Sequence, residues 1–271
     1  MVQENDRLDQ DYDYDVEHPT DERQVEARQC VVELVEGNKK AVWFSRQIEV
    51  LLEGKFFHWI TNRAVRELVD QHFLKGDVRN LKTGGEIHLV WHKGNRYYRR
   101  EATALLRLVN AYADPNVSGA IGLHGETMVL EGFARNEFVM RGRNTNSYGD
   151  RTWHETGHTL DFIFERDGKA YGIEVKNMLG YMEYDELKVK MSMCRYLRVG
   201  TVFVARMLPK SWIREIVDAG GFALILKYQL YPWTHRELAK TVKSGLGLPV
   251  DAPRVLEEGT MRRFLRWHER A

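Results

Sequence analysis

Residues 160–177 read LDFIFERDGKAYGIEVKN, and this stretch gives the clearest indication of fold class in the chain. An Asp-Gly pair at 167–168 lies between two runs of alternating residues, which predicts a β-hairpin closed by a two-residue type I′ turn. Such a turn fixes the register of the two strands, because each residue before the turn has one partner after it. In that register Asp161 faces Glu174 across the hairpin.

The two facing carboxylates share their surface with a lysine. Lys176 follows Glu174 by two residues, so both side chains point to the same face of the strand. Two unit charges about 5 Å apart repel by roughly 3 kcal/mol at an effective dielectric of 20. Facing carboxylates therefore share a proton or hold a metal ion, and oxygen-only ligands favour Mg²⁺ or Mn²⁺ over zinc.

A third acid, Glu126, lies in the segment 119–134, where we expect a helix. It fits an apolar stripe that contains Leu123 and Leu130 at helical spacing. Burying an unpaired charge is costly, so packing this stripe on the sheet would aim Glu126 at the two facing carboxylates. The alternative is a glutamate at the edge of the stripe that pairs with a surface arginine.

These residues resemble the PD-(D/E)XK, or restriction-endonuclease-like, nuclease superfamily. In that family a helix acid and a strand aspartate precede Glu-x-Lys on the next strand. Archaeal Holliday-junction resolvases and Mrr-type nucleases are the most similar members. The expected order of elements over 117–228 (helix, hairpin, helix, strand, helix, strand) also resembles the family core, although Leu160 stands where the family has proline. The resemblance implies an α/β fold with a mixed sheet flanked by helices.

The resemblance also implies a metal-dependent DNA endonuclease. Asp161 and Glu174 would hold Mg²⁺ or Mn²⁺ together with the backbone carbonyl of Val175. Glu126 would contribute directly or through water. Lys176 would orient or deprotonate the attacking water and offset charge on the scissile phosphate.

The helix expected near 182–197 carries a candidate accessory residue. The family often places one more polar side chain on this helix, and Lys190 is our candidate. The alternative, which we favour, is an exposed lysine that pairs with Glu186 four residues earlier.

Residues 28–115 resemble a winged-helix DNA-binding domain. Helices are expected at 45–53 and 62–73, followed by a hairpin with strands at 86–92 and 96–100. In a winged helix one helix enters the major groove while the hairpin contacts phosphates. The expected DNA contacts are two helix arginines and four basic residues on the hairpin, namely Arg63, Arg66, Lys93, Arg96, Arg99 and Arg100. A winged helix that docks a protein instead of DNA is the alternative.

A histidine motif at 154–158, HETGH, matches the pattern of zinc metallopeptidases. That chemistry requires one helix carrying both histidines, whereas the glycine and threonines here are poor helix formers. We therefore expect His154 and His158 on a loop that borders the nuclease site and contacts DNA, and a zinc peptidase is a minor alternative. Three arginines flank this loop and are further expected phosphate contacts, namely Arg141, Arg143 and Arg151.

The charge distribution divides the chain. Residues 1–27 contain ten acidic side chains against two arginines, so a net charge of +1 for all 271 residues leaves +9 on the remainder. We expect a disordered acidic tail at 1–27 and a basic body that binds a polyanion, here DNA. The expected domains are that tail, the winged helix at 28–115, the nuclease domain at 116–233 and a helical tail at 234–271.

Several classes of protein are excluded or disfavoured by the sequence. No window approaches 18 uninterrupted apolar residues, so we expect no membrane span, and the acidic N-terminus does not resemble a secretory signal. Two cysteines fit a reducing compartment, and we expect a cytoplasmic, nucleoid-associated protein. The chain lacks a P-loop motif, so we expect no ATP-driven step. Cutting both strands needs two active sites, so we expect a homodimer. The main rival is a winged-helix DNA-binding regulator with an inert nuclease core.

Overall fold

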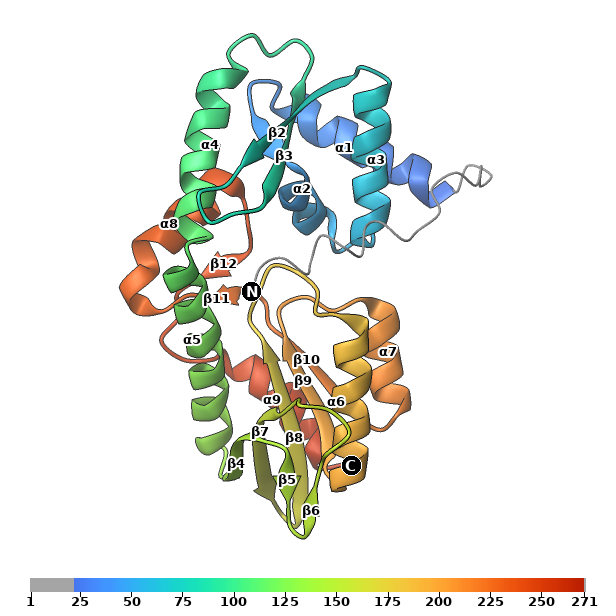
Figure 1. The fold of residues 1–271 in the computed structure, drawn as a ribbon, viewed down its shortest axis with the longest axis vertical. Helices are drawn as coiled ribbons and strands as arrows, with labels where there is room; N and C mark the ends of the chain where they lie inside the picture. Colours follow the sequence, from blue (N-terminus) through green and yellow to red (C-terminus); the bar gives the residue numbers. More distant parts are fainter. Residues whose placement is uncertain (1–21, 271) are drawn as a thin grey trace. The chain divides into compact units, whose positions relative to one another are not determined.

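The computed structural model describes residues 22–270, and these form two compact units (Figure 1). The first unit comprises residues up to 117 together with 241–248, and the second comprises 118–240 together with the residues from 249. Most of the expected acidic tail lies outside the described residues, but 22–27 form the first turns of a helix. Within the described range, no helix is long and apolar enough to cross a membrane.

The first unit contains a three-stranded antiparallel sheet of order β1-β3-β2. Three helices pack against it around a core that includes Ile48, Leu68 and Leu74, all of which are buried. Its elements are α1 (Glu22–Gly37), β1 (Val42–Phe44), α2 (Ser45–Leu52), α3 (His58–Asp70), β2 (Leu74–Asn80), β3 (Glu86–His92) and α4 (Tyr98–Tyr112). The helix expected at 45–53 is therefore present as α2, and the one expected at 62–73 is present as α3, which begins and ends earlier than predicted.

The hairpin of this unit differs from the one we predicted. β3 pairs with β2, which precedes it, and residues 98–100 belong to helix α4 instead of a strand. The helix starts because the Asn95 side chain accepts a hydrogen bond from the Tyr97 N–H at 3.0 Å, and Tyr98 stacks on Trp91 at 4.3 Å. Four basic residues consequently lie in the turn before α4 or in its first turn, and not on a wing, namely Lys93, Arg96, Arg99 and Arg100.

The second unit is a three-layer α/β structure. Its five-stranded mixed sheet has the order β10-β9-β8-β7-β4, in which β8, β9 and β10 are parallel and β7 is antiparallel to both neighbours. Its elements are α5 (Pro115–Ala134, which begins at the boundary), β4 (Val139–Thr145), β5 (Ser147–Tyr148), β6 (Arg151–Thr152), β7 (Leu160–Arg166), β8 (Lys169–Lys176), α6 (Tyr184–Leu197), β9 (Gly200–Ala205), α7 (Lys210–Asp218), β10 (Phe222–Ile225), β11 (Gln229–Leu230), the 3₁₀ turn η1 (Trp233–His235), β12 (Val250–Asp251) and α9 (Glu258–His268). Helix α8 (Arg236–Leu246) is divided between the two units.

The predicted β7–β8 hairpin is confirmed. Its ladder runs from Arg166↔Lys169 to Phe162↔Ile173, which is the register that the turn implied. The two turn residues have φ values of 53° and 73°, as a type I′ turn requires. The hairpin therefore presents alternate side chains to the two helical layers of the second unit.

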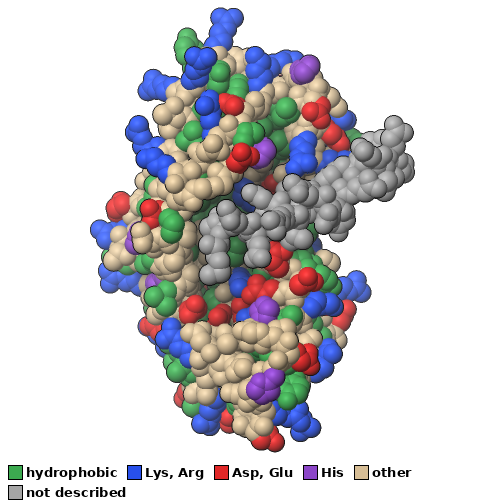
Figure 2. All heavy atoms as spheres, in the orientation of Figure 1, with side chains coloured by type: hydrophobic (Ala, Val, Ile, Leu, Met, Phe, Trp, Pro, Cys, Tyr) green, Lys and Arg blue, Asp and Glu red, His purple; other side chains and the backbone are tan. Residues whose placement is uncertain are grey.

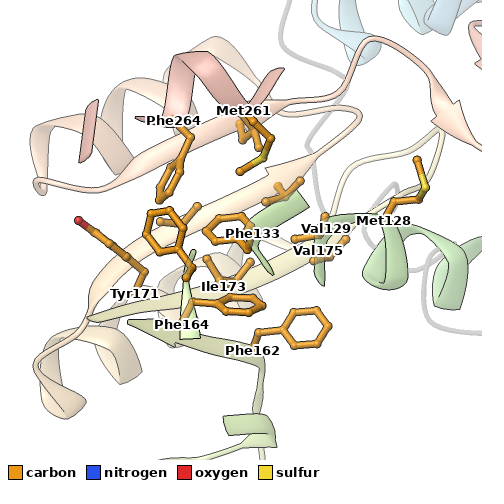
Figure 3. Packing of buried hydrophobic residues seen from close by; sticks show 14 of the residues in the cluster. Met128, Val129, Phe133, Phe162, Phe164, Tyr171, Ile173, Val175, Met261 and Phe264 are labelled. Atoms are coloured by element: carbon orange, nitrogen blue, oxygen red, sulfur yellow. The ribbon is translucent and has the colours of Figure 1, made fainter. Parts of the chain in front are cut away.

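One face of the sheet packs against α5 and α9 (Figure 3). Phe133 of α5 lies at 4.8 Å between ring centroids from both Phe164 of β7 and Phe264 of α9, and all three side chains are fully buried. Truncating one such ring to alanine typically costs about 3–5 kcal/mol. This packing fixes α5 over β7, whereas α6 and α7 cover the opposite face through Leu187 and Ile216.

The three arginines that flank the histidine loop lie on strands. β4 forms one edge of the sheet and pairs with β7, so that Arg143 lies opposite Phe162. Arg141 and Arg143 are therefore strand residues, and Arg151 belongs to β6. The irregular backbone that contains His154 and His158 covers 153–159.

Candidate active site

The predicted acids lie at the open end of the β7–β8 hairpin. The ladder of paired residues stops at Phe162↔Ile173, so Asp161 and Glu174 are the next residues on the two strands. The Asp161 carboxylate accepts a hydrogen bond from the Val175 backbone N–H at 2.7 Å, which takes the place of a further backbone bond of the ladder. Burial raises the pKa of Glu174, and the charge of Asp161 adds to this effect. The two carboxylates thus lie at the same end of the hairpin, although the ladder does not extend to the facing pair that the turn predicted.

The negative charge of Glu174 is balanced by two lysines. Lys190 Nζ of α6 lies 2.6 Å from Glu174 Oε2, and Lys176 Nζ lies 3.1 Å from Glu174 Oε1. Lys190 is buried, so our preference for an exposed lysine was wrong. Its expected partner Glu186 instead contacts Lys176 at 2.8 Å. The carboxylate pair is therefore compensated by the protein itself, and neither a shared proton nor a metal ion is needed to explain Glu174.

Glu126 lies beside this group, but not as part of a buried stripe. Leu123, expected in the same stripe, is 57% exposed, and the buried face of α5 is formed by residues such as Met128 and Phe133. Glu126 forms an ion pair with Arg143 at 3.7 Å, which is the alternative that we left open. Burial is the main cause of the raised pKa of Asp161, and the charge of Glu126 adds to it.

The charges of the site leave one carboxylate without an ion pair. Glu174 contacts two lysines, one of which also contacts Glu186, and Glu126 contacts Arg143. Within the described part of the chain, Asp161 has a hydrogen bond but no ion pair. Burial raises the pKa of Asp161, and the Val175 N–H and the charges of Lys190 and Lys176 only partly oppose this effect. Burial also raises the pKa of Glu174, so a cation beside these two carboxylates would favour their charged forms.

The donor atoms of the site suit a divalent cation, although no complete set of ligands is assembled. Among residues 22–270, no three His, Cys, Asp or Glu side chains are grouped so as to hold a metal ion. The available donors at Asp161 and Glu174 are carboxylate oxygens, which match Mg²⁺ and Mn²⁺. A cation at Asp161 would have to share Glu174 with the two lysines.

His154 and His158, which we expected on a loop beside the site, do not form a second cluster of metal ligands. Residues 154–158 lie in irregular backbone between β6 and β7, so the two histidines do not share a helix face and the zinc-peptidase interpretation is wrong. His158 Nδ1 lies 3.0 Å from Thr156 Oγ1, whereas His154 is exposed. The arginines nearby have partners of their own, because Arg141 contacts Glu165 at 3.0 Å and Arg151 donates to the Tyr196 carbonyl at 2.7 Å.

The first unit presents a basic surface of its own. Arg63 and Arg66 lie on α3, and Arg63 forms an ion pair with Glu67 at 3.2 Å. Trp59, four residues before Arg63 on the same helix, is 51% exposed. Figure 2 shows Lys and Arg side chains spread over the visible face of this unit, including over α4.

Comparison with known proteins assigns no family to the chain. No family model and no curated protein matches it. Among solved structures, it is similar to Can2 from Sulfobacillus thermosulfidooxidans in complex with cyclic tetra-adenylate, with 9% identity and a TM-score of 0.29. The match covers 75% of this chain and 52% of that protein, so the chain spans about half of its length. A score of 0.29 establishes no common fold, and the functional argument rests on the site.

Proposed function

We propose that this chain is a metal-dependent DNA endonuclease of the PD-(D/E)XK superfamily. The observation that carries the proposal is the meeting of Asp161, Glu174 and Lys176 at the open end of the β7–β8 hairpin. The chain order of β4, β7, β8, α6 and β9 around one mixed sheet supports it. So does the placement of Glu126, whose charge acts on Asp161 from the neighbouring helix.

The side chains of the site have separate roles in this proposal. Asp161, Glu174 and the Val175 carbonyl would hold Mg²⁺ or Mn²⁺, with Glu126 beside them. The bound cation would lower the pKa of a water molecule and offset charge on the scissile phosphate. Burial lowers the pKa of Lys176, but Glu174 and Glu186 outweigh this effect, so the net pKa is raised and the side chain stays protonated. Lys176 would therefore orient the water and the phosphate as a cation.

We further propose that the first unit is a winged helix that binds duplex DNA through α3. The order α1-β1-α2-α3-β2-β3 and the three-stranded sheet support this assignment. Trp59, Arg63 and Arg66 follow one another at helical spacing on the outer side of α3. The loop between β2 and β3 is attached to α4, because the Lys82 N–H donates a hydrogen bond to the Asn110 side chain at 2.7 Å. The helix, and not the hairpin, is then the main DNA-reading element.

The direct test is a cleavage assay on linear, nicked, flapped and four-way-junction DNA. Wild-type protein and Lys176→Ala are incubated with Mg²⁺, Mn²⁺ or EDTA. We expect cleavage by the wild type that requires a divalent cation, and loss of cleavage in Lys176→Ala while DNA binding persists. A wild type that cuts equally well in EDTA, or a Lys176→Ala variant that cuts normally, would contradict the proposal. Light scattering of the intact protein tests the expected homodimer.

A second candidate function is a DNA-binding regulator without nuclease activity. The double ion pair of Glu174 favours it, because two ammonium groups already occupy both oxygens of a carboxylate that a metal would need. The same assay separates the two functions. Binding without cleavage in every metal and on every DNA shape would establish the regulator.

A further inference from the structure

Four charged side chains form a continuous chain of alternating charge between β8 and α6. Lys190 contacts Glu174 at 2.6 Å, Glu174 contacts Lys176 at 3.1 Å, and Lys176 contacts Glu186 at 2.8 Å. Glu174 and Lys176 are two residues apart on a strand, whereas Glu186 and Lys190 are four apart on a helix, so each pair shares one face. The sheet and the helix therefore contribute one acid and one base each.

The two ends of this charge chain differ in burial. The side chains of Lys190 and Glu174 are 6% and 4% exposed, whereas those of Lys176 and Glu186 are 23% and 24% exposed. Lys190 also donates a short hydrogen bond to the backbone carbonyl of Thr159, just before β7. Lys190 is thus held by β8 and by the residue before β7, while Lys176 lies at the more exposed end of the charge chain, paired with Glu174 and Glu186.

A buried carboxylate without a counter-charge is strongly destabilising. Lys190 offsets part of this cost for Glu174 in the metal-free protein, because it lies within hydrogen-bonding distance and is itself buried. The same ammonium group repels any divalent cation that approaches Glu174, since like charges a few ångströms apart interact strongly away from water. Lys190 therefore has opposite effects on the metal-free and the metal-bound states.

We propose that Lys190 is a positioning residue that acts as an internal counter-ion for Glu174, holding this carboxylate in place before a divalent cation binds and weakening the binding of that cation. The inference rests on the proposed metal-dependent function. It assigns to α6 the control of metal affinity in a site whose ligands come from α5, β7 and β8.

The test compares Lys190→Met with Lys188→Met in the full-length protein. Lys188 lies on the same helix but is exposed and pairs with Glu215 of α7, so it is a matched control. Thermal melting is measured in EDTA and in Mg²⁺, and Mg²⁺ binding is measured by calorimetry. We expect Lys190→Met to have a lower melting temperature than the wild type in EDTA, and we expect Mg²⁺ to remove most of this difference. The variant should also bind Mg²⁺ at least about tenfold more tightly than the wild type. Lys188→Met should match the wild type in all three measurements.

A Lys190→Met variant whose Mg²⁺ affinity is unchanged or weaker, and whose lost stability Mg²⁺ does not restore, would overturn the proposal. If this variant does not fold in EDTA, the double variant Lys190→Met with Glu174→Gln replaces it, because removing both charges should restore the metal-free stability. A double variant as unstable as the single one would also overturn the counter-ion role. If the wild type binds no divalent cation, the proposed nuclease function is wrong. The stabilities of the single and double variants in EDTA would then still show whether Lys190 is the counter-ion of Glu174.

Discussion

Asp161 differs from every other acid of the site in how its charge is balanced. Glu126, Glu174 and Glu186 each contact a basic side chain, whereas Asp161 accepts a hydrogen bond from a backbone N–H. Burial raises the pKa of Asp161, which means that its charge is disfavoured in the folded, metal-free protein. In the proposed nuclease this cost is recovered when a cation binds.

The first prediction concerns the stability of the metal-free protein. Asp161→Asn keeps an acceptor for the Val175 N–H but removes the disfavoured charge, so it should raise the free energy of unfolding at pH 7 by about 0.5–2 kcal/mol in EDTA. Urea denaturation measures the change. Exposed Asp150 provides the control, and Asp150→Asn should change the stability by less than about 0.5 kcal/mol. A clearly destabilised Asp161→Asn would refute this reading of the site.

The second prediction gives the pH dependence of the same comparison. The pKa of the Asp161 carboxyl is raised in the folded state, so this carboxyl contributes to stability at low pH. That contribution to the free energy of unfolding is lost as pH rises through the folded pKa. The stability advantage of Asp161→Asn should therefore grow with pH, starting from the ordinary pKa of an aspartate. Urea denaturation at several pH values in EDTA measures it, and an advantage that shrinks with rising pH would be the wrong sign.

The burial of Lys190 was predictable at the residue scale, although we did not predict it. Lys190 lies three residues after Leu187 and four before Cys194, both of which are buried, and this places it within the apolar stripe of α6. We applied that argument to Glu126 and not to Lys190. The reverse error occurred at Leu123, because a stripe defined by a few apolar residues does not reveal which side of a helix meets the sheet.

At the scale of elements, the site depends on how the end of β8 is held. Asn177, the residue after Lys176, donates hydrogen bonds to the carbonyls of Ile121 and Leu230 and accepts one from the Leu230 N–H. These bonds join β8 to α5 and β11. Asn177 fits against α5 because Gly125 has no side chain, and a Cβ atom there would lie 2.5 Å from the Cβ of Asn177.

The third prediction uses two glycines of α5. Gly125→Ala should destabilise the protein by about 1–3 kcal/mol and reduce cleavage, because the added methyl group displaces Asn177 and with it the end of β8. Gly122 on the same helix has open space around it, so Gly122→Ala should stabilise the helix by up to about 1 kcal/mol and leave cleavage unchanged. Urea denaturation and the cleavage assay measure both effects. Equal behaviour of the two variants would show that the close approach has no role.

The elements that the sequence predicted well are those with strong local signals. The β7–β8 hairpin has a turn that only one register satisfies, and α2 and α3 have helical spacing of apolar residues. β2 was missed because LKGDVRN is mostly exposed and contains glycine and aspartate, so its strand form depends on pairing with β3. The misplaced strand at 96–100 had the composition of a strand, but the Asn95 turn begins a helix there.

At the scale of the whole molecule, each of the two compact units is built from two separate stretches of chain. Residues 241–248 return to the first unit, where the side chain of Gln47 donates a buried hydrogen bond to the Leu246 carbonyl. No local pattern in the sequence indicates a contact across 199 positions. We propose that the first unit binds DNA and that the second unit cleaves it.

The fourth prediction tests that division. Arg63→Ala and Arg66→Ala should each weaken DNA binding and lower the slope of log affinity against log salt by about one, because each removes one phosphate contact. The cleavage rate at saturating DNA should be unchanged. Arg214→Ala on exposed α7 is the control and should leave the affinity at the wild-type value. Fluorescence anisotropy over a range of salt concentrations measures the slope, and an unchanged slope in both α3 variants would exclude α3 as the DNA contact.

The proposed nuclease requires a divalent cation to bind between Asp161 and Glu174. The position of this cation can be mapped directly. Fe²⁺ is added in place of Mg²⁺ with ascorbate and peroxide, so that radicals formed at the metal cut the nearby backbone, and mass spectrometry locates the cuts. A cation at this position should give cuts beside residues 161 and 174 that excess Mg²⁺ suppresses and that Asp161→Asn abolishes. Cuts confined to other segments, or cuts at these strands that neither Mg²⁺ nor Asp161→Asn affects, would contradict it.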